Sequence, residues 1–442
     1  MPVTRREFLR FIGLSGVTLA LPGSCDALVV KLIAALQPTP TLVPIATIPP
    51  TSTATLSPTN TPAPTAAPAS TTTPRSILTS LLPYYAKDAR NNLVVRNGQR
   101  AMLSSHVYPK ATFVRDSFYG PLALGDAPLG YDCYRWFEQT QDQASGQIRT
   151  AVPFLPANEP LFPSQDDDSS LLFIPWSMWL KRHGLPIDQA LVEKAFAFVQ
   201  THVHDDWFVS PAGPFRYWAD TVAPDVDERI THNQGLYVLA LRSMIEFGWG
   251  GVTDRDLTNA RSNYAACYKS DIGAITLGKD SWWADKLDIS VLFPEFMLRW
   301  LFGEAALSDD VIRSTTDRFI QKASVFNNNE IAGIKVICAS DGSFLPPEKY
   351  FASVLNRPGD YQNGGYWPMY TLIALALRYK IDPDSALKQM IEQLVQNELA
   401  RDHRSKEVMM LIPGEVGNID PNRSGYTWNA LIAPALKWAN VV

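Results

Sequence analysis

From Ser76 to the end of the chain, apolar residues recur mostly three or four positions apart, as on one face of an α-helix, and strict alternation is rare. Asp382-Pro383 supplies a helix cap and a first-turn proline, and an apolar stripe of Leu387, Ile391 and Leu394 follows. Other segments with this period are 184–199, 235–247, 286–302, 308–323, 366–379 and 426–439. With weaker stretches included, the pattern predicts roughly ten to thirteen helices joined by loops. So many helices in one domain favour a toroid of helical hairpins over a simple bundle.

Residues 1–25 have the pattern of an export signal. Thr4–Arg10 holds two adjacent arginines ahead of Phe-Leu, and an apolar stretch from Phe11 to Leu21 follows. This order is typical of a twin-arginine signal, which exports proteins that have already folded. An ordinary basic leader in which the two arginines occur by chance is the alternative. We therefore expect an exported, extracytoplasmic protein.

The end of this segment resembles a degraded lipobox. Leu21–Cys25 places two small residues before Cys25, which would make that cysteine a lipid attachment site, although Pro22 stands where leucine is usual. Cleavage elsewhere and an uncleaved anchor are the alternatives, because a second apolar patch covers residues 27–36. A lipid or an anchor would tether the protein to the cell membrane.

Residues 26–75 continue from this patch into a segment that cannot form a core. Pro38–Pro74 contains ten prolines, twelve threonines and no charged residue. This composition cannot bury apolar surface and favours extended polyproline II, so we expect a disordered stalk about 115 Å long at most. The folded domain is predicted to occupy residues 76–442.

Composition and charge exclude several classes of protein. The net charge of −5 and the isoelectric point near 5.7 supply no basic surface for nucleic acid. Four cysteines in 442 residues do not make a disulfide scaffold. We expect Cys133, Cys267 and Cys338 to be buried thiols, with one bridging pair as the alternative. No apolar run reaches the roughly 18 residues of a confident membrane span, and no oligomerisation signal is visible, so a monomer is expected.

The predicted loops and helix starts carry carboxylates beside aromatic residues, which is the chemistry of a sugar site. An aromatic ring stacks on the C–H face of a pyranose, while Asp, Asn, Gln and Arg bind its hydroxyl groups. Taken singly, each position fits a helix cap or a core aromatic better, but their number favours carbohydrate binding. The candidate substrate-binding residues are Arg115, Asp116, Asp168, Trp218, Asn233, Gln234, Trp282, Trp283, Gln362, Asn363, Trp367 and Trp428.

The order of these motifs resembles that of the six-hairpin glycosidases, which include amylo-α-1,6-glucosidases, trehalases and processing α-glucosidases. Arg115-Asp116 is similar to the family's early Arg-Asp pair, and Trp218-Ala219-Asp220 to its Trp-x-Asp element. Tyr361–Pro368 resembles its Tyr-x-x-Gly-x-x-Trp-Pro motif, with one spacing shifted by a glycine. The resemblance spans roughly residues 112–439 and implies an all-α (α/α)6 toroid without a cofactor.

Three further positions follow the family's order. Asp167–Leu172 stands in place of a Val-Asp-Ala-Thr-like segment, and Asn233-Gln234 precedes a helix rich in Tyr, Leu and Ala. Glu415 precedes Trp428 by about a dozen residues, as a glutamate does in the family. One departure is that the family's glutamate before the next helix is missing and Glu228 lies five residues before Asn233 instead. The loop around Glu415 also lacks the family's fuller acidic signature.

The resemblance implies hydrolysis with inversion by two carboxyl groups. One, kept protonated, protonates the leaving oxygen, and the other activates water from about 6.5–9.5 Å away. We assign Asp220 as the acid, because Tyr217 and Trp218 can form an apolar wall beside it, and Glu415 as the base. Arg115, Asp116 and Asp168 would then bind hydroxyl groups, and the tryptophans Trp282, Trp283 and Trp367 would be stacking platforms.

Other functions compete with this interpretation. A surface carbohydrate-binding lipoprotein could keep the toroid and lose the chemistry. A sugar lyase or epimerase would need a Tyr or His base, for which His232 is the candidate. His202–Asp206 has metal-ligand residue types, but two histidines two positions apart cannot share a helix face, so no metal site is expected. Asp166–Asp168 resembles the acidic runs of helical prenyl-diphosphate enzymes, but no second acidic motif accompanies it.

Overall fold

The computed structural model describes residues 77–154, 167–399, 401–412 and 424–442. The predicted export signal, Cys25, the Pro/Thr segment and Glu415 lie outside these ranges. Among the described residues, no helix has both the length and the apolar character needed to cross a membrane. The fold below is therefore that of the predicted domain alone.

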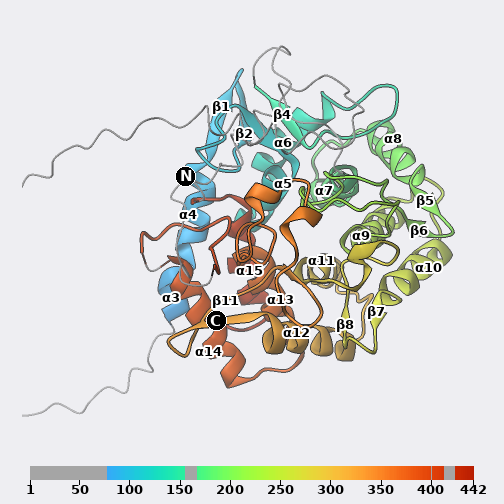
Figure 1. Cartoon of the computed structure of the whole chain (residues 1–442). Helices are drawn as coiled ribbons and strands as arrows, with labels where there is room; N and C mark the ends of the chain where they lie inside the picture. Colours follow the sequence, from blue (N-terminus) through green and yellow to red (C-terminus); the bar gives the residue numbers. More distant parts are fainter. Residues whose placement is uncertain (1–76, 155–166, 400, 413–423) are drawn as a thin grey trace, which may run out of the picture. The chain divides into compact units, whose positions relative to one another are not determined.

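Twelve helices within the described ranges alternate between two layers, after a short α3 (Ile77–Leu81) (Figure 1). The outer helices are α4 (Pro83–Asn91), α6 (Ala127–Glu138), α8 (Gln189–Gln200), α10 (Asp254–Ala265), α12 (Asp309–Ala323) and α14 (Ser385–Leu399). The inner helices are α5 (Val114–Leu124), α7 (Asp167–Arg182), α9 (Thr231–Phe247), α11 (Phe293–Phe302), α13 (Pro368–Ile381) and α15 (Ile432–Trp438).

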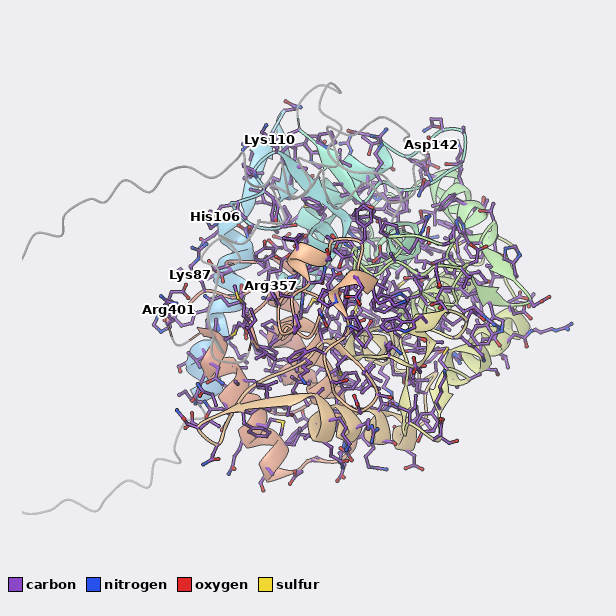
Figure 2. All side chains as sticks on the ribbon, in the orientation of Figure 1. Lys87, His106, Lys110, Asp142, Arg357 and Arg401 are labelled. Atoms are coloured by element: carbon purple, nitrogen blue, oxygen red, sulfur yellow. The ribbon has the colours of Figure 1, made fainter. Side chains whose placement is uncertain are left out.

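The helices α7 and α8 illustrate how burial differs between the two layers. Every residue of α7 from Asp167 to Leu180 is buried, whereas α8 buries only Val192, Ala195, Phe196 and Val199. A helix that is buried all round lies inside a protein, and a helix with one apolar stripe covers it. Exposed charged side chains such as Lys87, Lys110, Asp142 and Arg401 lie at the periphery (Figure 2).

The inner helices form a closed ring. Consecutive inner helices pack against each other from α5 to α15. The ring closes because α5 also packs against η6 (Trp428–Leu431), which leads into α15. Gly235 permits close packing of α9, since a Cβ atom there would lie 2.6 Å from Cβ of Pro294 in α11. Because an outer helix returns the chain between inner helices, the inner helices run in one direction and begin at the same end of the ring.

The strands are short antiparallel pairs in the connections. They are β1 (Leu93–Arg96) with β2 (Gln99–Met102), β3 (Ala111–Phe113) with β4 (Ala151–Pro153), β5 (Val203–His204) with β6 (Trp207–Phe208), β7 (Tyr268–Lys269) with β8 (Ala274–Ile275), β10 (Ser324–Asn327) with β11 (Glu330–Ile334), and β9 (Leu287–Asp288) with β12 (Ile337–Cys338). Short 3-10 helices are η1 (Trp282–Asp285), η2 (Ile289–Leu292), η3 (Pro347–Lys349) and η4 (Ser353–Leu355). None of these pairs forms a layer, so the domain stays a helical fold.

The structure corrects two predicted boundaries. Asp382 ends α13 instead of capping α14, and the carboxylate of Asp384 accepts hydrogen bonds from the backbone N–H groups of Ala386 and Leu387. The segment 286–302 is not one helix, because β9 and η2 precede α11. Pro294 lies in the first turn of α11, where the missing N–H is tolerated.

The cysteines Cys133, Cys267 and Cys338 are buried free thiols. Burial raises the pKa of Cys133 well above its usual range and that of Cys338 to about 12, which keeps both protonated. The alternative of a bridging pair among these three is therefore not found.

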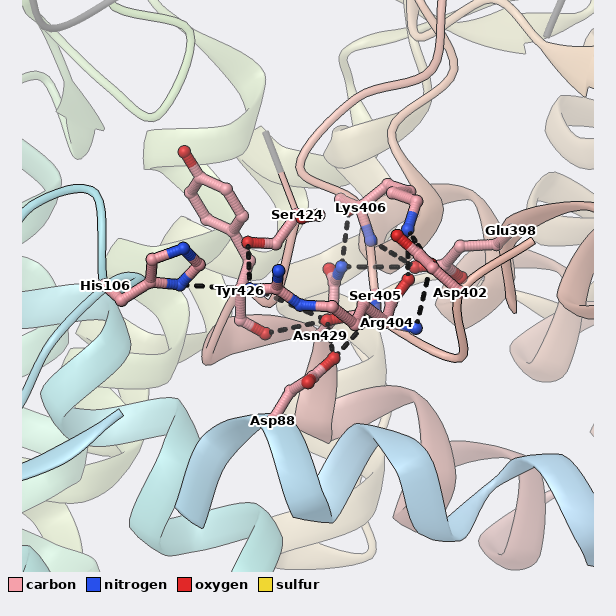
Figure 3. A network of polar contacts seen from close by, with 10 residues as sticks. All are labelled: Asp88, His106, Glu398, Asp402, Arg404, Ser405, Lys406, Ser424, Tyr426 and Asn429. Carbon is pink, nitrogen blue, oxygen red and sulfur yellow. Dashed lines mark hydrogen bonds and ion pairs between the residues drawn. The ribbon is translucent and has the colours of Figure 1, made fainter. Parts of the chain in front are cut away.

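The closure cluster (Asp88, Glu398, Ser405, Lys406 and Asn429) joins the first and last hairpins (Figure 3). Asp88 of α4 accepts hydrogen bonds from the N–H and hydroxyl of Ser405 at 2.6 and 2.8 Å. Glu398 of α14 accepts from the backbone N–H of Lys406 at 2.8 Å and from the side-chain amide of Asn429 at 3.3 Å, and the hydroxyl of Tyr85 also donates to it. The cluster fixes the ends of the ring to each other through buried polar contacts.

We predict that Glu398 makes the domain less stable as the pH rises. Burial raises its pKa to about 8, whereas an unfolded glutamate titrates near about 4.3. Between these values the native state holds a proton that the unfolded state has lost, so stability falls with pH by up to about 1.4 kcal/mol per unit. Thermal unfolding of the wild type and Glu398→Gln across this pH range measures the difference. Parallel stability curves for the two proteins would contradict the prediction.

Candidate functional site

Most of the predicted site residues lie at the end of the ring where the inner helices begin. Arg115 and Asp116 open α5, and Asp168 opens α7. Asn233 and Gln234 lie in the first turn of α9, Trp367 directly precedes α13, and Trp428 opens η6. These positions come from five hairpins that are far apart in sequence, and the common direction of the inner helices brings them to one end.

Arg115 and Asp168 form a buried pair between α5 and α7. The guanidinium donates through Nε at 2.9 Å and through Nη2 at 2.8 Å to the two carboxylate oxygens, a geometry that only arginine supplies. Burial raises the pKa of Asp168 and Arg115 opposes the rise, while the negative charge of Asp220 adds to it. Asp220 therefore lies within electrostatic reach of the pair.

Asp220 is held by the segment that precedes α13. Its Oδ1 accepts a hydrogen bond from the Gln362 side-chain amide at 2.8 Å and one from the Tyr361 hydroxyl at 3.3 Å. The carbonyl oxygen of the Gln362 side chain accepts from the N–H of Thr221 at 3.0 Å, which turns its amide nitrogen toward Asp220. Three residues from two distant segments thus fix the orientation of this carboxyl group.

The tryptophans of the site pack against one another. Trp218 meets Trp367 edge to face with ring centroids 5.0 Å apart, and Trp367 meets Trp428 in the same way at 5.7 Å. Tyr370 packs on Trp218 at 4.3 Å, and all four rings are buried. In this structure these rings form one buried aromatic cluster.

Trp282 and Trp283 form a separate pair on η1. Trp283 is buried, and its indole N–H donates to the carbonyl oxygen of Ala223 at 3.3 Å. Trp282 is half-buried, with the ammonium groups of Lys286 and Lys349 over its ring at 4.2 and 5.0 Å. The pair is attached to the loop that follows Asp220.

The predicted amide residues bind loops of the protein. The amide nitrogen of Asn233 donates to the hydroxyl of Ser210 and the carbonyl of Arg216, at 3.0 and 2.9 Å. Gln234 bridges the N–H of Phe208 and the carbonyl of Ala260. Asn363 binds the carbonyl of Leu345 at 2.7 Å and that of Asn356 at 2.9 Å. Asp116 accepts from the hydroxyl of Ser104. In this structure these side chains bind other segments of the protein.

Two acidic residues near the site are not among the predicted site residues. Burial raises the pKa of Asp288 to about 7, with Ser290, Tyr217 and Trp218 opposing the shift through hydrogen bonds. Burial also raises the pKa of Asp167, next to Asp168, to about 7. Asp167 belongs to the acidic run Asp166–Asp168, whereas Asp288 ends the two-residue strand β9 and has no sequence signal.

Glu228 and the alternative base His232 both contact other groups of the protein in this structure. Glu228 is buried and accepts three backbone N–H groups of residues 279–281, each at 2.7 Å, so it anchors a loop. His232 is buried beside the rings of Phe293 and Tyr370, and Nδ1 lies 3.0 Å from the carbonyl of Ser290. Burial lowers the pKa of His232 to about 3, so it is neutral at ordinary pH.

A metal site is not evident in the described ranges, where no three His, Cys, Asp or Glu side chains come together as ligands. Nε2 of His202 lies 3.8 Å from Oδ1 of Asp167. Burial lowers the pKa of His202.

The ring of twelve helices is found in solved enzyme structures. The chain is similar to a wild-type glycosidase with a TM-score of 0.57 and 14% identity, over 83% of this chain and 97% of that one. The chain has the (α/α)6-toroid fold. A GH63 mannosylglycerate hydrolase from Thermus thermophilus, in complex with Tris and D-glycerate, matches at 0.55 and 10% identity over 81% and 99%. A D-mannose isomerase matches at 0.55 and 12% over 85% and 100%. No family profile and no curated protein sequence matches the chain.

We predict that the two members of the Arg115–Asp168 pair differ in how much their loss destabilises the domain. Arginine keeps its charge in proteins, so Asp168→Asn leaves that charge buried without the carboxylate and costs about 3–5 kcal/mol. In Arg115→Met, Asp168 takes up a proton, because burial already raises its pKa, and the loss is smaller. Urea unfolding of both variants measures the difference. Equal losses, or a larger loss for Arg115→Met, would contradict the prediction.

Proposed function

We propose that this protein is an exported, membrane-tethered glycoside hydrolase that acts on an oligo- or polysaccharide with inversion. The observation that carries the proposal is the fixed orientation of Asp220 within electrostatic reach of the Arg115–Asp168 pair, at the end of the ring where the inner helices begin. A general acid must present its proton in one direction, and two neutral donors hold this carboxyl group in one orientation.

Asp220 accepts hydrogen bonds from two side chains through one oxygen. Tyr361 and Gln362 both donate to Oδ1, so that oxygen acts as an acceptor. This arrangement supports Asp220 as the group that protonates the leaving oxygen of a glycosidic bond.

The surrounding charges suit the transition state of this reaction. Cleavage of a glycosidic bond builds positive charge on the sugar ring, as an oxocarbenium-like state. The buried carboxyl of Asp168 lies within electrostatic reach of Asp220, and buried Asp116 opens the neighbouring helix. Because the carboxylate of Asp168 is paired with the Arg115 guanidinium, the negative charge that favours such a state is assigned to Asp116.

The second carboxylate is assigned to Glu415, which lies outside the described residues. The same chain segment holds another acid, Glu407, which is buried. Its segment pairs with the one that orients Asp220, since Tyr366 and Met409 exchange backbone hydrogen bonds at 2.9 and 2.8 Å. Both glutamates are therefore tested as the base.

The titles of the similar structures support a carbohydrate substrate. They name a glycosidase, a hydrolase of mannosylglycerate and an isomerase of D-mannose. An isomerase on the same fold is a reason to include free hexoses in any substrate screen. A binding protein without catalysis would retain sugar affinity in that screen and release no product.

We predict that Asp220→Asn lowers kcat by about 10³-fold or more on the best substrate of a glycoside screen, because the leaving oxygen loses its proton donor. Asp225→Asn, an exposed acid five residues along the same loop, serves as the control and should keep full activity. Proton NMR of the first product formed gives its anomeric configuration, which should be inverted. An Asp220→Asn enzyme with wild-type kcat would refute the assignment.

The base is distinguished by comparing Glu415→Gln with Glu407→Gln on the same substrate. The true base variant should lose turnover and recover part of it when azide replaces water as the nucleophile. If neither variant loses turnover while Asp220→Asn does, another carboxylate activates the water. If the wild type binds sugars but hydrolyses none, the binding-protein alternative holds.

We predict that export depends on the arginine pair and tethering on Cys25. In a bacterium with a twin-arginine pathway, replacing Arg5 and Arg6 by lysine should retain the protein in the cytoplasm. Cys25→Ala should leave export intact and release the protein from the membrane fraction. Fractionation and labelling with a radioactive fatty acid measure both effects. A membrane-bound Cys25→Ala protein would favour the uncleaved anchor instead.

A further inference from the structure

The loop that carries Asp220 is also attached to the ring on the side away from Gln362. Tyr217 and Trp218 immediately precede Ala219 and Asp220, and both side chains reach the turn at Asp288–Ser290. The Tyr217 hydroxyl donates to Oδ2 of Asp288 at 3.2 Å. The indole N–H of Trp218 donates to the Ser290 hydroxyl at 2.6 Å.

Asp288 builds the turn to which these residues are attached. It caps η2, where its Oδ1 accepts the backbone N–H of Ser290 at 2.9 Å. The carbonyl of Ser290 lies 3.0 Å from Nδ1 of His232 in α9. The same turn therefore touches the loop of Asp220 and the start of an inner helix.

The turn is also connected to the segment of Tyr361 and Gln362, which orients the carboxyl group of Asp220. Ile289 donates its backbone N–H to the carbonyl of Val336 at 3.0 Å, and Val336 donates to the carbonyl of Gly365 at 3.1 Å. Gly365 follows Gln362 by three residues in the segment that orients Asp220. The turn at Asp288–Ser290 is thus joined to both segments that determine where the carboxyl of Asp220 lies.

A buried carboxyl group at this turn destabilises the fold when it is ionised. Asp288 is fully buried, and burial raises its pKa to about 7, so its ionised form is disfavoured. The hydrogen bonds that oppose this effect come from Ser290, Tyr217 and Trp218, which are the residues of the attachment itself. An asparagine could cap the turn without the charge penalty, accepting from Ser290 and donating to the Tyr217 hydroxyl.

We propose that Asp288 is a positioning residue for Asp220: through Tyr217 and the Ser290 turn, it holds the loop from 217 to 221 in the geometry needed for proton transfer. The inference rests on the proposed function, since it names the residue that supports the proposed acid. Asp288 touches no reacting atom in this proposal.

The test compares Asp288→Ala and Asp288→Asn with Glu295→Ala as a control. Glu295 is also buried, but its partners are Arg299 in α11 itself and Ala306 and Leu307 in the α11–α12 connection. Misplacement of a catalytic group by about 1 Å can cost about 10²-fold in rate. Asp288→Ala should therefore lower kcat about 10²-fold with KM changed less than about threefold, whereas Asp288→Asn should keep most of kcat. Glu295→Ala should lower the Tm and leave kcat of the folded enzyme unchanged.

A second measurement does not require activity. Hydrogen exchange of peptides covering residues 215–222 should be about tenfold faster in Asp288→Ala than in the wild type, because the loop opens locally. It should be unchanged in Glu295→Ala. Tyr217→Phe removes the same hydrogen bond from the other side, so its effect on exchange should not add to that of Asp288→Ala.

The outcomes separate this inference from the proposed function. Unchanged exchange in Asp288→Ala, or equal loss of kcat in Asp288→Ala and Asp288→Asn, overturns the positioning role. Faster exchange in Asp288→Ala together with a fully active Asp220→Asn overturns the assignment of the acid and leaves the support of the loop established. Loss of activity in Asp220→Asn with normal kcat in Asp288→Ala overturns the positioning role alone.

Discussion

A helix that is enclosed by protein on all sides can hold polar side chains only where they are paired or where the helix begins, and this constraint places the candidate site. In α7, the polar residues Asp167–Ser170 come first and a buried apolar run from Leu171 follows. In α9, Thr231–Gln234 comes first and Gly235–Leu241 follows. The free N–H groups and positive dipole at a helix start favour carboxylates such as Asp116 and Asp168. Because the inner helices run in one direction, their polar first turns meet at one end of the ring.

The helical ring was predictable because its determinants are local. Apolar spacing identifies a helix, and a dozen helices in one domain limit the arrangements that bury them. The contacts of Asp220 were not predictable, since Gln362 lies 142 residues away and is brought there by loops with no periodic pattern. The same holds for Asn233 and Asn363, whose residue types suit sugar hydroxyls as well as they suit the backbone groups that they bind here. Residue type and order thus predicted which residues lie at one end of the ring. Which groups these side chains contact could be learned only from the fold.

Buried acids with raised pKa values occur both at the candidate site and away from it. Asp167 and Asp288 have values of about 7, and Glu398 in the closure cluster has a value of about 8. Perturbed titration therefore does not identify a catalytic group in this protein, because a structural network perturbs it as strongly. What distinguishes the acids is their contacts. Glu398 joins the first and last hairpins, whereas Asp288 contacts the loop that carries Asp220.

The attachments of that loop also explain how one fold serves dissimilar sequences. Asp220 is oriented by Gln362 and Tyr361 on one side, and its loop is attached to the turn of Asp288 on the other. These contacts belong to connections between helices and leave the apolar packing of the ring untouched. A ring whose core requires only apolar helices of suitable length tolerates wide sequence change, which agrees with identities of 10–14% to structures that share the fold. The loop contacts that orient Asp220 can therefore change in sequence without disturbing the packing of the ring.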